Sequence, residues 1–463
     1  MVFIAMLTKV LKARASLAVA LAAGFLLPSL AARAQGNQTI IRDAEIEQLM
    51  RDYATPVFRV SGINAGATKI ILVGSRDFNA FVASGRKVFV NAGVIMESST
   101  PNQVIGVLAH ETGHIAGGHL FRLREQLERA QILAVAGALL GAGAVIGGSR
   151  SGNVGVSGSG AVLGTITAPA EIARRSLLSY QRSEEQAADK AALRYLNQTG
   201  QSAKGMIETF QRFADDTLFR RVGADPYLQS HPSAPERIGS LKEEAEKSPH
   251  FNKPDPAALK ARHDLARGKL IGFITRPDEL ARRYAPTDTS LGAKYARAIS
   301  AYRFGNVALA QTQIDALIAQ QPANPYFWEL KGQSLLEGGK ARESIAPLRK
   351  AVSLSPNQPL IRALLGQALV STGDVRDADA AIKELTTATQ RDPENADTYQ
   401  FLARAYGAKN NEPMAALSAA LGYAISGQQE EAKRLARRAK AGLKEGSPAW
   451  LKADDIINQP SQT

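Results

Sequence analysis

The sequence has no cysteine and few aromatic residues. Without cysteine the chain can form no disulfide and can carry no lipid-modified cysteine at its N-terminus. Aromatic residues make up 6% of the chain and are not interleaved with a basic stretch, which argues against nucleic-acid binding. The formal charge of +13 then indicates either a solvated basic surface or attraction to anionic lipid headgroups and acidic partners.

The first 34 residues are typical of a cleavable export signal. Lys9, Lys12 and Arg14 form a basic region, an apolar run follows over 15–27, and small residues stand just before residue 35. These 34 residues hold four basic side chains and no acid, which leaves a charge of +9 on the rest. We therefore expect residues 1–34 to be removed and the protein to be periplasmic.

The segments that follow alternate between helical and strand-like patterns. Residues 38–62 predict a helix and a turn, and residues 68–96 have the β-branched and aromatic runs of short strands. From Thr100 the spacing of apolar residues is that of a helix, and helical texture resumes over 170–215. The pattern predicts a mostly helical α+β domain over 35–245.

A regular period marks the C-terminal part of the chain. Three Gly-polar pairs recur at intervals of 34 residues, at Gly305-Asn306, Gly339-Lys340 and Gly373-Asp374. A helix-turn-helix unit of this length is typical of tetratricopeptide repeats, which stack into an α-solenoid with a concave surface for partners. We expect repeats over 290–455, joined to the first domain by a charged, proline-containing connector at 246–289.

One short stretch, LAHETGHIAGGH, contains the motif H-E-x-x-H at His110, Glu111 and His114. On a helix the two histidines project from one face about one turn apart. Zinc hydrolases use this motif because two imidazoles hold Zn²⁺ while the glutamate takes a proton from the water that attacks a peptide carbonyl. The motif predicts one zinc ion per chain, with Glu111 as the general base.

This site needs a third ligand. His119 lies nine residues after His110, about half a turn round a helix from it, so we expect a histidine on the surface or on a second face. A carboxylate from a later helix would leave one position open for water. In YQRSEEQAADKAALRYL (180–196), Glu185 is the best donor and Asp189 its expected hydrogen-bond partner, although an isolated stretch of this kind equally fits an ordinary acidic face.

The motifs occur in an order that resembles one family. H-E-x-x-H is followed by Y-x-R-x-x-E-x-x-A-D and then by His231-Pro232 with Arg237-Ile238, and NAFVASGRKVFVNAGVI (79–95) precedes them. The set resembles the zinc metalloproteases that include the CAAX prenyl proteases and the heat-shock protease HtpX. With an export signal and a tetratricopeptide array, the chain resembles the BepA-type periplasmic proteases and chaperones of outer-membrane assembly.

The resemblance implies a zincin-like metalloprotease domain in which His110, His114 and Glu185 bind zinc and Glu111 is the general base. It also implies that His231 and Arg237 lie near the active site, where the histidine stabilises the oxyanion or occupies the open zinc position and keeps the enzyme latent. The implied function is a zinc-dependent endopeptidase with chaperone activity in quality control and assembly of outer-membrane proteins. Unfolded or misassembled outer-membrane proteins would be its clients, and the repeats would dock on the assembly machinery. The alternative is a metal-stabilised chaperone or adaptor whose repeats carry the function, with little proteolysis.

The uncharged run ILAVAGALLGAGAVIGG (132–148) is almost long enough to cross a membrane. It lies between His114 and Glu185, however, and a single crossing would separate these two residues across the bilayer. We therefore expect residues 132–168 to form an apolar flap over the cleft that touches a membrane or an unfolded client. We also expect a substrate to pair along an edge strand within 86–92.

Overall fold

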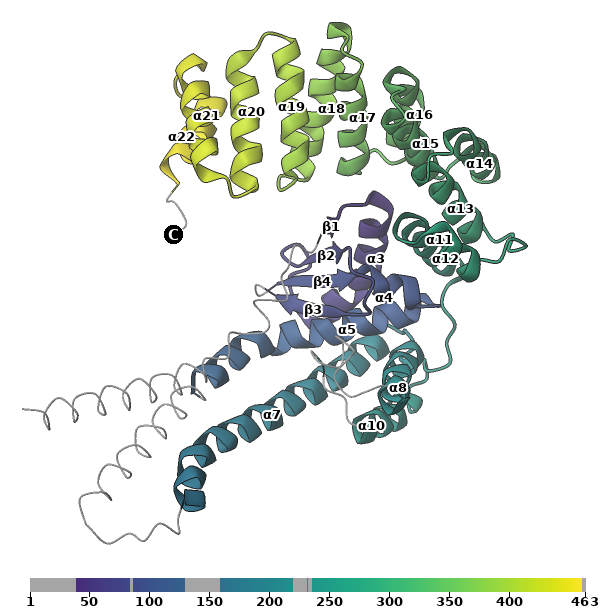
Figure 1. The fold of residues 1–463 in the computed structure, drawn as a ribbon, viewed down its shortest axis with the longest axis vertical. Coiled ribbons are helices and arrows are strands. Elements are labelled where there is room, and N and C mark those ends of the chain that lie inside the picture. Colours follow the sequence, from purple (N-terminus) through teal and green to yellow (C-terminus); the bar gives the residue numbers. More distant parts are fainter. Residues whose placement is uncertain (1–38, 84–85, 130–158, 220–230, 232–234, 460–463) are drawn as a thin grey trace, which may run out of the picture.

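A computed structural model describes residues 39–83, 86–129, 159–219, 231 and 235–459. Within 159–178, 213–219 and 235–237 it describes the backbone alone. The predicted signal peptide and the predicted flap up to residue 158 lie outside the described residues. A mixed α/β domain is followed by an arc of helices whose inner side faces that domain (Figure 1), as the α+β and solenoid pattern predicts.

A four-stranded sheet forms one part of the first domain, and its strands are β1 (Ile40–Ile41), β2 (Lys69–Val73), β3 (Ala80–Ala83) and β4 (Lys87–Asn91). The strand order is β1-β2-β4-β3, with β2 and β4 parallel and with β1 and β3 antiparallel at the two edges. The expectation of an edge strand within 86–92 is therefore wrong, because β4 pairs on both sides and β3 is the edge. The residues after β4 were expected to be strand-like but form the short helix α4 (Ala92–Glu97).

The helices of this domain are α3 (Ala44–Ser61), α5 (Pro101–Gly117), α7 (Ser159–Gln198), α8 (Lys204–Phe219) and α10 (Pro235–Glu246). Helix α3 begins at Asp43, whose carboxylate accepts a hydrogen bond from the Ile46 amide at 2.9 Å. Proline begins α5 at its first turn, and Gly118 with φ +66° ends it. These local signals fix both ends of the helix that carries the H-E-x-x-H motif.

Helix α5 packs against α3, α7, α8 and β3 at the centre of the domain. Glycines allow this close approach. A Cβ atom at Gly113 would lie 2.8 Å from the Ala188 carbonyl oxygen on α7, and one at Gly106 would lie 2.6 Å from Met206 Cβ on α8. Ala188 is completely buried. Small side chains on α5 and α7 therefore bring the two motif-bearing helices into backbone contact.

The segment 246–289, expected to be a connector, contains two packed helices, α11 (Ala257–Ile274) and α12 (Pro277–Arg283). Helix α11 pairs with α13 (Leu291–Arg303), and a Cβ atom at Gly268 would lie only 2.3 Å from the Gly292 carbonyl oxygen. Helix α11 also contacts α3 and α4 of the first domain. It therefore joins the two parts through a continuous core as well as through the chain.

The remaining helices stack in antiparallel pairs as the 34-residue period predicts. They are α14 (Val307–Gln320), α15 (Pro325–Glu337), α16 (Ala341–Leu354), α17 (Pro359–Ser371), α18 (Ala378–Arg391), α19 (Ala396–Ala408), α20 (Glu412–Ile425), α21 (Gln429–Gly442) and α22 (Pro448–Asn458). Gly305, Gly339 and Gly373 end the first helices of three units with φ values of +88°, +77° and +69°. Only glycine adopts this conformation without strain, which explains why it recurs. Among the helices described, none is long and apolar enough to cross a membrane.

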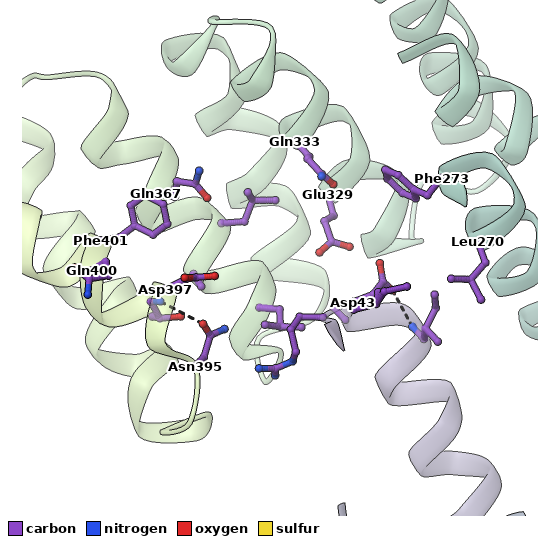
Figure 2. Close-up of a pocket in the computed structure, with 18 of the residues that line it drawn as sticks. Asp43, Leu270, Phe273, Glu329, Gln333, Gln367, Asn395, Asp397, Gln400 and Phe401 are labelled. Atoms are coloured by element: carbon purple, nitrogen blue, oxygen red, sulfur yellow. Dashed lines mark hydrogen bonds between the residues drawn. The ribbon is translucent and has the colours of Figure 1, made fainter. Parts of the chain in front are cut away.

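A groove of about 700 Å³ separates part of the arc from the first domain (Figure 2). Side chains from α11, α15, α17 and α19 line it, including Phe273, Gln333, Gln367 and Phe401. At its border Lys269 on α11 is 3% exposed, and its ammonium is 2.7 Å from the Asp43 carboxylate. Lys269, Asp43, Glu45, Glu329 and Tyr295 are named the lysine cluster below.

Candidate metal centre

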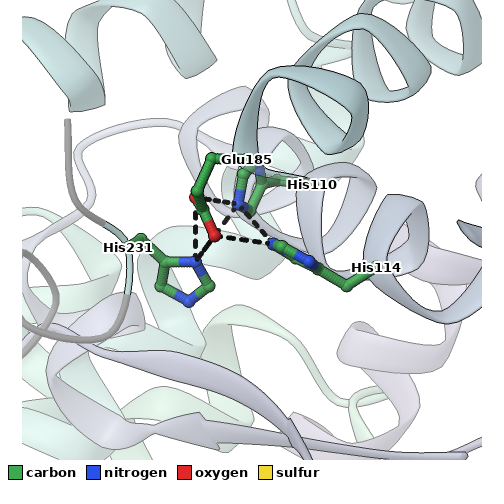
Figure 3. Close-up of side chains that lie close together, drawn as sticks. All are labelled: His110, His114, Glu185 and His231. Carbon is green, nitrogen blue, oxygen red and sulfur yellow. Dashed lines mark hydrogen bonds and ion pairs between the residues drawn. The ribbon is translucent and has the colours of Figure 1, made fainter. Parts of the chain in front are cut away.

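Four side chains from distant parts of the sequence converge in the first domain (Figure 3). His110 and His114 extend from α5 and Glu185 from α7, His231 lies between α8 and α10 in the sequence, and one ligand atom of each lies within 4.8 Å of the others. The Nε2 atoms of His110 and His114 are 3.1 Å apart, and each lies 3.3 Å from a Glu185 carboxylate oxygen. Bonds of 2.0–2.1 Å in a tetrahedron place neighbouring ligand atoms roughly 3.3 Å apart. The donor set and its spacing therefore fit zinc.

The buried environment shifts the pKa values of these groups strongly. Burial would lower the pKa of His110, but hydrogen bonds to Asp189 and Glu185 raise it to about 10. Burial lowers the pKa of His114 to about 3. Burial would raise the pKa of Glu185, but the charge of His231 and the hydrogen bonds of the three imidazoles hold it well below its usual range. A metal must displace the proton of His110, so metal binding weakens as the pH falls.

Glu111 lies beside this cluster on α5. Its side chain is completely buried, and its Oε1 atom is 3.4 Å from His231 Nε2. Among the described residues neither of its carboxylate oxygens accepts a hydrogen bond. Burial raises the pKa of Glu111, and the charges of His231 and His110 oppose that rise. A carboxylate in this position is suited to exchanging a proton with a molecule bound at the cluster.

Asp189 lies one turn after Glu185 on α7 and is 1% exposed. Its Oδ1 atom is 2.8 Å from His110 Nδ1. Asp189 was expected to be a hydrogen-bond partner of Glu185, whereas the structure places it behind His110. Because it engages Nδ1, it turns the Nε2 atom of His110 toward Glu185 and His114.

His119 is buried, at 6% exposure, and the expectation of a surface or second-face histidine is wrong. Its Nδ1 atom is 2.9 Å from His114 Nδ1, and its Nε2 atom is 2.8 Å from Glu184 Oε2. Half a turn of separation holds only for a straight helix, and α5 ends at Gly117 before a new helical segment runs over 119–129. The consecutive glycines Gly117 and Gly118 were the signal in the sequence.

His231 bridges the cluster and the edge of the sheet. Its Nδ1 atom is 3.1 Å from Glu185 Oε1, and its Nε2 atom is 3.2 Å from the Ala80 carbonyl oxygen. Ala80 lies opposite Val90 on β4, next to the hydrogen-bonded pair of Asn79 and Asn91, so its carbonyl points away from β4 toward the open edge. Arg237, expected to accompany His231, lies on α10, and its side chain lies outside the described residues.

A small cavity of about 170 Å³ opens beside these groups. Phe81 and Val82 of β3 line one side, and Leu120, Leu123 and Tyr180 line another, with Glu111 and His114 among the polar residues at its wall. The cavity is much smaller than the roughly 300–1,000 Å³ of sites for whole small-molecule ligands. Its size suits one side chain of an extended peptide.

Two known protein families match parts of this chain. Residues 41–245 match the family described as Peptidase family M48, and residues 295–359 match the tetratricopeptide repeat. The Beta-barrel assembly-enhancing protease of Escherichia coli (strain K12) is 25% identical over 439 residues, which cover 92% of this chain and 85% of that protein. The protein of the same name from Yersinia pestis is 26% identical over 397 residues, covering 84% and 78%.

A further relative matches less than half of the chain. Metalloprotease YcaL of Escherichia coli (strain K12) is 26% identical over 208 residues, which cover 45% of this chain and 73% of that protein. The similarity of the longer relatives thus extends through both the sheet-containing domain and the helical arc.

Proposed function

Since residues 41–245 form a metallopeptidase domain of family M48 that tetratricopeptide repeats follow, we propose that the chain is a zinc-dependent endopeptidase. His110, His114 and Glu185 would hold the ion, and Glu111 would be the general base. The observation that carries the proposal is the convergence of two Nε2 atoms and one carboxylate beside a buried glutamate with a raised pKa.

When bound, zinc supplies Lewis acidity that polarises the scissile carbonyl and lowers the pKa of water to about 7. Glu111 then accepts a proton from the attacking water and delivers it to the leaving amine. Asp189 fixes the tautomer of His110 throughout. An extended substrate would pair along β3, whose Ala80 carbonyl points to the open edge, and would place one apolar side chain against Phe81, Leu120 and Leu123.

The position of His231 favours the interpretation that this enzyme has a latent form. It lies among the metal-binding groups and also contacts the Ala80 carbonyl, the same edge position that a substrate strand would use. A substrate must therefore displace His231 from both places before it reaches Glu111. The alternative role for His231 is to stabilise the oxyanion, together with Arg237.

The wider role follows from the relatives and the architecture. Two relatives that span most of the chain are named Beta-barrel assembly-enhancing protease. We propose that residues 1–34 direct export of this protein to the periplasm. There it would act on unfolded or misassembled outer-membrane proteins. The repeats of the 290–455 domain would dock it on the assembly machinery, and residues 132–168 would contact a membrane or a client. The position of His231 also favours a second function, that of a chaperone or adaptor with little proteolysis.

The test measures zinc content and cleavage of an unfolded β-barrel protein by the mature chain. We expect wild type to bind one zinc ion and cleave slowly, and Glu111→Gln to keep zinc while losing at least about 100-fold in rate. His231→Ala should cleave faster than wild type. Glu128→Gln on the exposed part of 119–129 is the matched control and should behave as wild type.

Retained cleavage in Glu111→Gln would contradict the assignment of the general base. Zinc binding by every variant with no cleavage of any unfolded protein would favour the adaptor. A wild-type chain that binds no zinc would overturn the metallopeptidase proposal for these residues.

A further inference from the structure

We infer that His119, Glu184 and Arg122 form a hydrogen-bond relay that orients His114 toward the metal. The inference rests on the proposed zinc site and adds three positioning residues to it. None of the three offers an atom to the four-residue cluster, and each acts through the next. The relay begins behind His114 and ends at the protein surface.

The contacts form an unbroken chain. His114 Nδ1 lies 2.9 Å from His119 Nδ1, His119 Nε2 lies 2.8 Å from Glu184 Oε2, and the Arg122 guanidinium lies 2.7 Å from the same carboxylate oxygen. The rings of His114 and His119 stand edge to face, with centroids 4.9 Å apart. His119 is 6% exposed, whereas the Arg122 side chain is 46% exposed. The chain thus leads from a ligand whose side chain is 13% exposed, through a buried imidazole, to solvent.

The polarity of the relay follows from what each atom can donate. Glu184 accepts from both Arg122 and His119, so the proton of neutral His119 is on Nε2. Its Nδ1 atom is then an acceptor, and His114 must donate to it from Nδ1. That tautomer leaves His114 Nε2 without a proton and facing Glu185 and His110, as a metal ligand requires.

The relay has a counterpart on the other histidine. His110 Nδ1 is held by Asp189, so each imidazole ligand has its outer nitrogen engaged and its Nε2 atom turned inward. All three carboxylates come from α7. Glu185 faces the metal position, Asp189 lies directly behind His110, and Glu184 lies behind His114 through His119. A helix places Glu185 and Asp189 on one face, one turn apart, and Glu184 roughly 100° round from Glu185, which allows one helix to serve both ligands.

His119 reaches this place because the chain turns at the end of α5. Gly118 adopts φ +66°, and its amide hydrogen-bonds to the His114 and Ile115 carbonyls, so the next residue folds back toward His114. A Cβ atom at Gly117 would lie 2.1 Å from His119 Nε2. Both glycines are therefore needed for the imidazole to fit beside the helix.

The experiment measures zinc affinity of the mature chain by competition with a chelating dye, together with the absorption spectrum of the Co²⁺-substituted protein. His119→Ala and Glu184→Gln should each weaken zinc binding by about 10–100-fold and shift the Co²⁺ bands. His119→Asn restores an acceptor near His114 and should recover part of the affinity. In the double variant His119→Ala with Glu184→Gln, the losses should not add, because both belong to one chain.

Arg122→Gln breaks the relay at its exposed end and should have the smallest effect of the series. His250→Ala, which removes a half-buried histidine outside the site, is the matched control and should bind zinc as wild type does. If His119→Ala does not fold without metal, as urea unfolding would show, Glu184→Gln and Arg122→Gln carry the test.

Wild-type zinc affinity and Co²⁺ spectra in His119→Ala and Glu184→Gln would overturn the relay. Independent, additive losses in the double variant would overturn it as well. A wild-type chain that binds neither metal would instead contradict the proposed zinc site, so the two failures are distinguishable.

Discussion

This protein has two clusters of converging polar and charged side chains, and they differ in what lies at the centre of each. In the metal cluster, imidazole nitrogens and carboxylate oxygens of His110, His114, Glu185 and His231 point at one another (Figure 3). In the lysine cluster, carboxylates point at an ammonium that belongs to the chain, since Lys269 Nζ is 2.7 Å from Asp43, 3.4 Å from Glu45 and 3.7 Å from Glu329. One cluster needs a cation from solution, and the other contains one.

The lysine cluster nevertheless carries more acids than its single cation balances. Burial raises the pKa of Glu45 and raises that of Glu329 to about 7, with Lys269 opposing both shifts. Burial would lower the pKa of Lys269, but the charges of Asp43 and its neighbours hold it well above its usual value. Tyr295 donates a hydrogen bond to Glu45 at 3.1 Å. These groups come from α3, α11, α13 and α15, so the cluster fixes the arc against the first domain.

The difference teaches how to distinguish a structural cluster from a functional one. A buried carboxylate is stable when a protein cation lies within its reach, and such a group serves the fold. Nitrogen and oxygen donors that converge at metal-ligand spacing, with their outer atoms engaged by further partners, serve a ligand. By this criterion the lysine cluster joins domains, whereas the metal cluster performs chemistry.

The largest expected effect is on the lysine cluster. Lys269→Met leaves the buried Glu45 and Glu329 and the half-buried Asp43 without this cation and should lower the free energy of unfolding by about 3–5 kcal/mol. Urea unfolding followed by circular dichroism measures it. The matched control is Lys69→Met, whose ammonium pairs with Glu394 across the same two domains but is 46% exposed, and which should lose less than about 1 kcal/mol. Equal losses in both variants would contradict the contrast between buried and exposed pairs.

Zinc that binds to the metal cluster should raise the free energy of unfolding of the protein. At a free zinc concentration of about 100 times its dissociation constant, wild type should gain roughly 2.7 kcal/mol in free energy of unfolding over the chelated protein. Glu185→Gln removes a ligand and should gain much less at the same concentration. Lys269→Met should keep the full gain, because its cluster does not bind the metal. A gain of equal size in Glu185→Gln would show that the ion stabilises the protein elsewhere.

The smallest expected effect is the change with pH in the contribution of Glu329 to the free energy of unfolding. Burial raises the pKa of Glu329 from 4.5 to about 7, so between these values the folded state holds a proton that the unfolded state has lost. Its contribution to stability therefore falls as the pH rises from about 4.5 to about 7 and is constant above that. Glu329→Gln cannot ionise and should be more stable than wild type at pH 8 by on the order of 1–2 kcal/mol. Urea unfolding at pH 5 and pH 8 checks this, and an unchanged difference between wild type and variant at the two pH values would contradict it.

Much of the fold was predictable because its signals are local. The 34-residue spacing of glycines predicted the helix pairs, since each needs a left-handed residue at the same point. The contact of Gly113 with Ala188, which brings α5 against α7, was seen only in the structure. The helices of the 246–289 segment were missed because charged residues and prolines are typical of a connector and because α11 has no distinct apolar face in its sequence. The lysine cluster was not predicted at all, since its members are up to 286 residues apart and none belongs to a motif.

The sequence by itself determined which groups can bind a metal and that helices would carry His110, Glu111 and Glu185, because the motif and the helical period depend on neighbours along the chain. Only the tertiary structure decided that β3 rather than β4 is the free edge, that Asp189 supports His110, and that His119 turns back to His114. Strand order and helix contacts depend on packing between segments distant in sequence, whereas the turn at Gly118 is local and only its consequence for His119 needed the folded structure. Such packing depends on how side chains fit together in the folded protein. The spacing of residues along the chain does not specify that fit.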